Sequence, residues 1–171
     1  IITVLLGHFV GLLTPVEVWH LLGIHAHHKQ LIAMTLGGVF GVICFIGLTI
    51  LLRRRLFNPR IRATSSNMDI TVLLLLYAQL ILGLGSIFIS AQHTDGEEML
   101  LLMSWAQNIA TFDPAQAASA IASVHWIYKL HVFLGMSLFV VFPFSRLVHV
   151  FSVPVKYVGR HYQIVRKKAW H

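Results

Sequence analysis

The chain has 171 residues, of which 57% are hydrophobic and only 11% charged, and its mean hydropathy is +0.76. Soluble domains carry about a quarter charged residues, so this composition excludes a disordered protein and an ordinary soluble enzyme. The single cysteine, Cys44, excludes an internal disulfide. The net charge of +7 would indicate nucleic acid in a soluble protein, but the apolar composition indicates a membrane protein instead.

The first two apolar stretches differ in length. Residues 1–13 would form a helix of roughly 20 Å, which cannot cross a hydrocarbon core of about 30 Å. The stretch starts abruptly with no basic segment before it, so it is not a signal peptide. We expect it to be the second half of a spanning helix whose first half precedes this chain. Residues 31–52 contain no charge and are long enough to span the bilayer.

The third and fourth stretches predict two more spanning helices. Residues 70–90 contain Gln79 as their only strongly polar side chain. Residues 124–151 are long enough to span but less uniformly apolar, and are interrupted by Lys129, His131, Pro143, Arg146 and His149. We therefore predict an all-α transmembrane helical bundle within residues 1–155, followed by a basic tail at residues 156–171.

The basic residues predict the orientation of this bundle. The link at residues 53–62 contains five arginines, and the tail at residues 156–171 contains five Lys and Arg residues. Two spanning helices separate link and tail, so both lie on one side, which the positive-inside rule identifies as the cytoplasm. The charge is thus mostly a matter of topology, and no nucleic-acid partner is expected. The link is either a solvated loop or a surface for docking other subunits.

The outer link at residues 91–123 contains a helix-start signal. Thr94-x-x-Glu97 has the spacing of a capping box and precedes the short apolar run Met99–Ala106. We expect this run to form a helix lying along the membrane interface.

Two histidines inside the predicted helices lie at matching depth. Ionisable residues within a membrane are costly and indicate function. His8 lies six residues before the first helix leaves the membrane, and His131 lies seven residues after the fourth helix enters from the same face. At about 1.5 Å per residue, both lie roughly 10 Å deep. Two imidazoles at one depth on different helices can supply both axial ligands of one haem.

A third histidine, His149, lies about five helical turns beyond His131 and so shares its helix face. It would lie some 27 Å deeper if the helix stayed straight, although Pro143 is able to bend it. His149 could there bind a second haem, whose other ligand would precede residue 1. Glycines beside these histidines, Gly7, Gly11 and Gly135, would leave room for a flat macrocycle.

Other interpretations of these residues remain open. An intramembrane histidine can also be a hydrogen-bonded packing residue or part of a proton relay. His25-x-His27-His28 has a spacing that can bind a metal ion, although no cysteine or carboxylate lies beside it. Lys29 at the outer edge either extends its amine toward the headgroups or donates a hydrogen bond to a quinone.

The sequence resembles a known family. The segments that carry the resemblance are GHFVGLLTP, RRRLFNPRIRATSS, SAQHTDGEEM and KLHVFLGMSLFVVFPFSRLVHVFSVPVKY. They are similar to the γ subunit of respiratory membrane-bound nitrate reductase, the dihaem cytochrome b that anchors that enzyme, over nearly the whole chain. The family has five helices, which implies half of the second helix and three complete helices here.

The resemblance also implies site residues. The segments GHF and KLH would place both ligands of a distal haem b, near the outer face, at His8 and His131. RLVH would place one ligand of a proximal haem b at His149, with its partner upstream of this chain. Lys29, together with Gly7 and His8, would bind the quinol.

The implied function is that of an enzyme subunit in the bacterial cytoplasmic membrane, in contact with lipid. Menaquinol or ubiquinol would be oxidised near the outer face, with two protons released outside. Electrons would pass through the distal and then the proximal haem to an iron–sulfur β subunit. From there they would reach a molybdenum α subunit, which reduces nitrate in the cytoplasm.

The same residues also fit several other functions. Related dihaem anchors serve heterodisulfide-reductase-like and sulfite-reduction assemblies, and nitrite oxidoreductases run the nitrate reaction in reverse. A different class is a proton channel or transporter with His8, His131 and His149 as a relay. A relay predicts no haem spectrum and further carboxylates in the membrane, for which Asp69 is the only candidate in the sequence. A passive anchor would need none of the three histidines.

Overall fold

The structure is a computed structural model that describes residues 1–92 and 95–148. Within this part the chain is helical and contains no strand, which confirms the all-α prediction. Its elements in chain order are α1 (Ile2–Leu13), α2 (Val16–Leu21), α3 (Ala26–Phe57), α4 (Pro59–Ala63), α5 (Asn67–Ser90), α6 (Glu97–Ala110), α7 (Pro114–Ser123), α8 (Trp126–Val141) and the 3-10 turn η1 (Phe142–Phe144).

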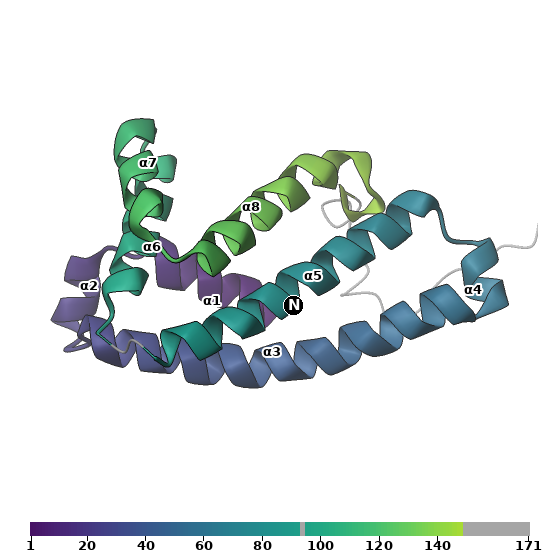
Figure 1. The fold of residues 1–171 in the computed structure, drawn as a ribbon, viewed down its shortest axis with the longest axis horizontal. Helices are drawn as coiled ribbons and strands as arrows, with labels where there is room; N and C mark the ends of the chain where they lie inside the picture. The colour runs from purple at the N-terminus through teal and green to yellow at the C-terminus, as the bar shows by residue number, and fades with distance from the viewer. Residues whose placement is uncertain (93–94, 149–171) are drawn as a thin grey trace, which may run out of the picture.

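Three long helices lie side by side and form the body of the molecule (Figure 1). α5 packs against α3 on one side and against α8 on the other. α1 contacts α3 and α6, begins near the middle of the molecule and runs to the end where α2 lies (Figure 1). α6 and α7 form a hairpin that projects at this same end, here named the α2 end; the opposite end is named the α4 end (Figure 1).

The long helices have the length and the surface expected of membrane spans. Three segments of the described chain are long and apolar enough to cross a membrane: Ala26–Phe57, Asn67–Ser90 and Trp126–Phe144. Large apolar side chains on α1, α3, α5 and α8 are exposed, which suits contact with lipid rather than water. The fully buried apolar residues instead gather mainly at the α2 end, in and beside the α6–α7 hairpin: Met103, Ala106, Ala117, Ala120, Val124 and Tyr128.

Two spans differ in extent from the sequence expectation. α3 is longer than the expected 31–52 and continues through the first three arginines of the link. The last span does not continue as one helix through residue 151: α8 ends at Val141, and Pro143 lies in the 3-10 turn that follows. Proline lacks the N–H that an α-helix needs and clashes with the preceding turn, which explains the break. The straight-helix distance to His149 therefore does not apply, and His149 itself lies outside the described residues.

The capping box lies at a different helix from the one expected. α6 begins at Glu97 with Gly96 as its N-cap, so the prediction of a cap at Thr94 is wrong; Thr94 lies outside the described residues. Instead, the box forms at α5, where Ser66 Oγ accepts from the Asp69 amide and Asp69 Oδ2 accepts from the Ser66 amide. The Thr-x-x-Glu spacing is typical of a capping box, but it does not by itself fix where the helix begins.

Asp69 also contacts the segment that follows α8. Arg146 Nη1 lies 3.5 Å from Asp69 Oδ2, and the Asp69 side chain is only 7% exposed. The carboxylate that a proton relay would require is thus engaged in capping α5 and in an ion pair at the end of its helix.

Gly96 allows the start of α6 to lie against the start of α3. Its φ is +86°, and a Cβ there would lie 2.8 Å from Ala26 Cβ and 3.0 Å from the Ala26 carbonyl carbon. Gly23 also has a positive φ, +73°, but has open space around it. Only glycine adopts this backbone region without a steric cost of about 1–2 kcal/mol.

We predict that Gly96→Ala destabilises the protein more than Gly23→Ala, because it adds a clash to the same backbone strain. The strain alone should lower the Tm of the detergent-solubilised protein by roughly 2–8 °C. Gly47→Ala, in a helix and in open space, is the control and should cause no loss of stability. Equal Tm values for the Gly96 and Gly23 variants would show that the α6–α3 contact is not tight.

Candidate functional site

The structure brings together two of the three intramembrane histidines. The His8 ring on α1 and the His131 ring on α8 have their centroids 6.0 Å apart, with an angle of 32° between the ring planes. His149 lies outside the described residues, so its relation to this pair is not described.

The His8 ring is oriented by its own helix. His8 Nδ1 lies 2.8 Å from the carbonyl oxygen of Val4, one turn earlier on α1. An Nδ1–H that donates to this carbonyl leaves Nε2 with its lone pair free, the form in which an imidazole binds a metal. His8 is exposed, and the neighbouring Gly7 and Gly11 both have open space where a Cβ would lie.

The His131 ring is oriented by α5. Its Nε2 lies 3.2 Å from the Nε2 of Gln79, and its Nδ1 is buried with no hydrogen-bond partner among the described residues. A Cβ on Gly83 would lie 3.1 Å from His131 Cε1, so the ring packs directly against the α5 backbone. In the sequence Gln79 is only the strongly polar residue of its span, and the sequence does not predict that it contacts His131.

The geometry of the two rings fits a bis-imidazole haem. Nitrogen ligands bind metal ions at about 2 Å, so two axial imidazoles would have their ring centroids roughly 6 Å apart. Within residues 1–92 and 95–148, no group of three or more His, Cys, Asp or Glu side chains could hold a metal ion. Among the described residues, a metal between His8 and His131 thus has no third His, Cys, Asp or Glu ligand beside it.

This result also bears on the histidines near the start of α3. The rings of His25 and His28 lie 6.1 Å apart and those of His27 and His28 lie 5.7 Å apart. Neighbouring rings alone do not form a metal site, and the described residues supply no such set here. The described residues therefore give no support to the interpretation of His25-x-His27-His28 as a metal site.

Lys29 is buried, which contradicts the first of its two interpretations, that its amine extends to the headgroups. Only 6% of the residue is exposed. Its Nζ donates to the carbonyl of Gly11 at 2.6 Å and to the sulfur of Met103 at 2.7 Å, and lies 4.7 Å from the centroid of the Trp19 ring. Lys29 thus connects α3 to α1, α6 and α2.

The end of α1 receives a second donor from α6. Gln107 Nε2 donates to the carbonyls of Leu12 at 3.1 Å and Thr14 at 3.3 Å. Carbonyls at the end of a helix have no partner within the helix, so side chains of other helices complete their hydrogen bonding. Since Gly11 lies one turn after His8, these contacts place the α1 face that carries the candidate ligand.

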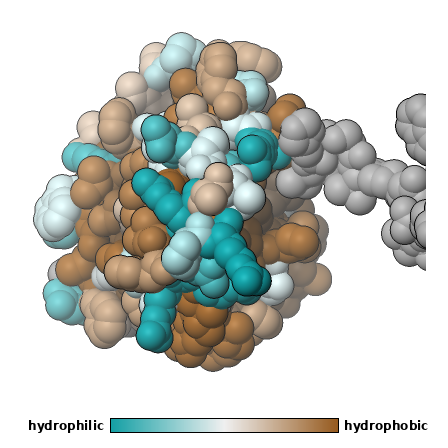
Figure 2. Space-filling view, turned by 90° about the vertical axis from the view of Figure 1, so that its right-hand side faces the viewer, coloured by the Kyte–Doolittle hydropathy of each residue, from teal (hydrophilic) through white to brown (hydrophobic). Residues whose placement is uncertain are grey.

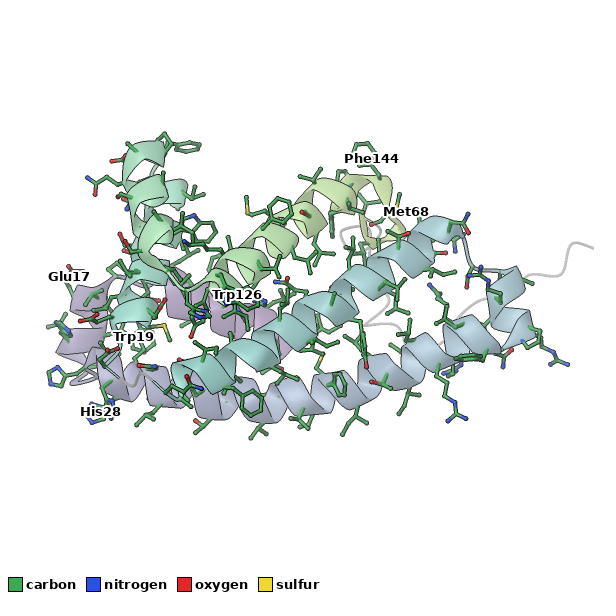
Figure 3. The ribbon with its side chains drawn as sticks, in the orientation of Figure 1. Glu17, Trp19, His28, Met68, Trp126 and Phe144 are labelled. Carbon is green, nitrogen blue, oxygen red and sulfur yellow. The ribbon has the colours of Figure 1, made fainter. Side chains whose placement is uncertain are left out.

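Trp19 is a residue that the sequence did not single out. Figure 3 shows it with His28 at the α2 end, whereas Met68 and Phe144 lie toward the α4 end. Its Nε1 is buried and has no hydrogen-bond partner in the part of the chain that is described. A buried N–H without an acceptor beside Lys29 is unusual and suits a site for a polar ligand.

A basic patch covers the α4 end. Figure 2 views this end and shows hydrophilic side chains in front of a largely apolar body. The exposed basic residues of α3 and α4 here are Arg53, Arg54, Arg60 and Arg62. This patch and the candidate pair of imidazoles therefore lie on different parts of the molecule.

Comparison with known proteins identifies a family. Residues 1–168 match the family described as nitrate reductase gamma subunit. The respiratory nitrate reductase 1 gamma chain of Escherichia coli (strain K12) is 48% identical over 171 residues, which cover 98% of this chain and 74% of that protein. The nitrate reductase gamma chain of Bacillus subtilis (strain 168) is 39% identical over 163 residues, which cover 95% and 72%.

We predict that Lys29→Met lowers the stability of the protein by about 1–3 kcal/mol, because it removes the charged donor from Gly11. Thermal unfolding in detergent measures this effect. Lys129→Met is the matched control, since Lys129 is exposed and bonds only the nearby Ala122 carbonyl; its effect should stay within about 0.5 kcal/mol. Equal unfolding temperatures of the two variants would contradict a role for Lys29 in holding α1.

Proposed function

The chain belongs to the nitrate reductase gamma subunit family, which supplies a membrane cytochrome b subunit to an oxidoreductase complex. From this premise we propose that the chain oxidises quinol and delivers the electrons to the other subunits. The 6.0 Å spacing of the His8 and His131 rings is the observation that carries the proposal. A haem b held by His8 and His131 would supply one-electron transfer.

In this proposal His8 and His131 hold the distal haem. The Val4 carbonyl would hold His8 in the tautomer that leaves Nε2 free as a ligand. His149, which lies outside the described residues, would be a ligand of the proximal haem. The family membership supports both assignments, and the spacing of the rings supports the first.

The quinol lies beside the α1 face that carries Gly7 and His8. Lys29 is close to this face through its bond to Gly11, and its second partner is the thioether of Met103. Sulfur is a weak acceptor, so a quinol oxygen is able to replace Met103 while the bond to Gly11 persists. Lys29 then donates to the quinol oxygen and favours its deprotonated form, and the hydroxyl proton leaves to water at the α2 end.

Each quinol that is oxidised loses two electrons and two protons. We place the proton release at the α2 end, outside the cytoplasm. The basic patch at the α4 end would then lie in the cytoplasm, as the positive-inside rule requires for its arginines. There it contacts the iron–sulfur subunit, through which electrons reach the molybdenum subunit and nitrate.

Reduced-minus-oxidised optical spectra of the full complex in membranes test this proposal. We expect His8→Ala and His131→Ala each to remove about half of the haem b absorbance, because a haem that loses one axial ligand is no longer held. His20→Ala, at an exposed histidine of α2, is the control and should leave the spectrum unchanged. A wild-type complex without haem b bands would overturn the proposal and favour the proton relay.

A further inference from the structure

α5 and α8 interlock through two glycines, one on each helix. A Cβ on Gly83 of α5 would lie 3.1 Å from Cε1 of His131, and a Cβ on Gly135 of α8 would lie 3.1 Å from Nε2 of Gln79. On each helix the polar residue precedes its glycine by four positions, so the two share one helix face. Each helix thus offers a notch at its glycine that receives the polar side chain of the other.

The two polar side chains in these notches contact each other and have unused hydrogen-bonding groups. Gln79 Nε2 lies 3.2 Å from His131 Nε2. Gln79 Oε1 and His131 Nδ1 are both buried without a hydrogen-bond partner among the described residues. A buried polar atom left unpaired costs about 1–3 kcal/mol, so packing alone does not account for an amide at this position.

The chemistry of an imidazole ligand accounts for both unused groups. A ring bound to a metal through one nitrogen carries a hydrogen on the other, and that N–H needs an acceptor. The two ends of the Gln79 amide have the same shape, so a half-turn of the amide presents Oε1 to the His131 ring in place of Nε2. Oε1 then accepts from Nε2–H, the ring nitrogen that Gln79 contacts, and Nδ1 is left free as a ligand.

We propose that Gln79 is a positioning residue for His131: its amide oxygen accepts the ring N–H, fixes the ring orientation and strengthens the imidazole as an electron donor. This inference rests on the proposed function, in which His131 is an axial ligand. The two imidazoles of the pair are then oriented differently, His8 by a backbone carbonyl of its own helix and His131 by a side chain of α5.

The test is a redox titration of the full complex in membranes, with haem content and the low-spin electron paramagnetic resonance signal measured on the same samples. Gln79→Leu keeps the approximate volume and removes the acceptor. Gln79→Glu keeps an oxygen acceptor in either protonation state. Ser137→Ala on α8 is the control, because Ser137 Oγ donates to the Phe133 carbonyl of its own helix.

We expect Gln79→Leu to raise the midpoint potential of the distal haem and shift its resonance signal, because a less basic imidazole stabilises the oxidised iron less. Gln79→Glu should stay closer to the wild-type potential than Gln79→Leu, or fall below it. Loss of the distal haem in the leucine variant with retention in the glutamate variant would support the same role.

The outcomes that overturn the inference are distinct from those that overturn the proposed function. Gln79 would be only a packing residue if Gln79→Leu left the midpoint potential unchanged at full haem content. The same conclusion would follow if both Gln79 variants shifted the potential equally or lost equal amounts of haem. Gly135→Ala provides a second route, since it displaces the amide without altering it. This variant should shift the midpoint potential in the same direction as Gln79→Leu. A wild-type complex without haem would instead overturn the proposed function.

Discussion

The position of α1 depends on hydrogen bonds that two side chains of other helices donate to its last carbonyl groups. α1 has 12 residues and no buried residue, so apolar packing contributes little to holding it. Lys29 donates to Gly11, and Gln107 donates to Leu12 and Thr14. These carbonyls would otherwise have no partner inside their helix. Because α1 carries His8, the distance between His8 and His131 follows from these contacts at the α2 end.

Polar side chains specify how the long helices meet. Apolar helix surfaces gain little free energy by associating within a bilayer, because lipid tails are equally apolar. Close backbone approach and hydrogen bonds between helices therefore determine the packing. The interlocked pairs of α5 and α8 combine both, with Gln79 and His131 each seated against a glycine. Gln30 acts similarly at the α2 end, where its Nε2 donates to the carbonyl and the hydroxyl of Ser90. The helix contacts and the candidate ligand geometry therefore have a common origin.

The two ends of the molecule differ in chemistry in a way that suits a membrane electron carrier. Trp19 lies at the α2 end with Lys29 beside it, and the candidate imidazole pair lies on α1 and α8. The opposite end carries the basic patch and the ion pair of Asp69 with Arg146. In the proposed function quinol chemistry occupies the first end and subunit contact the second, so substrate oxidation and electron delivery are separated by the thickness of the membrane.

The membrane class, the helical architecture and the family could be predicted from the sequence, because hydropathy over about 20 residues and segments such as KLHVFLGMSLFVVFPFSRLVH are local properties. Counting residues from the helix ends also predicted that His8 and His131 share one depth. The three-dimensional structure was needed to show that their ring centroids lie 6.0 Å apart, that Lys29 is buried, and that Gln79 contacts His131. Depth follows from the rise per residue along one helix. Which side chains meet depends on the rotation and crossing of neighbouring helices, and these are set by contacts between residues far apart in the chain.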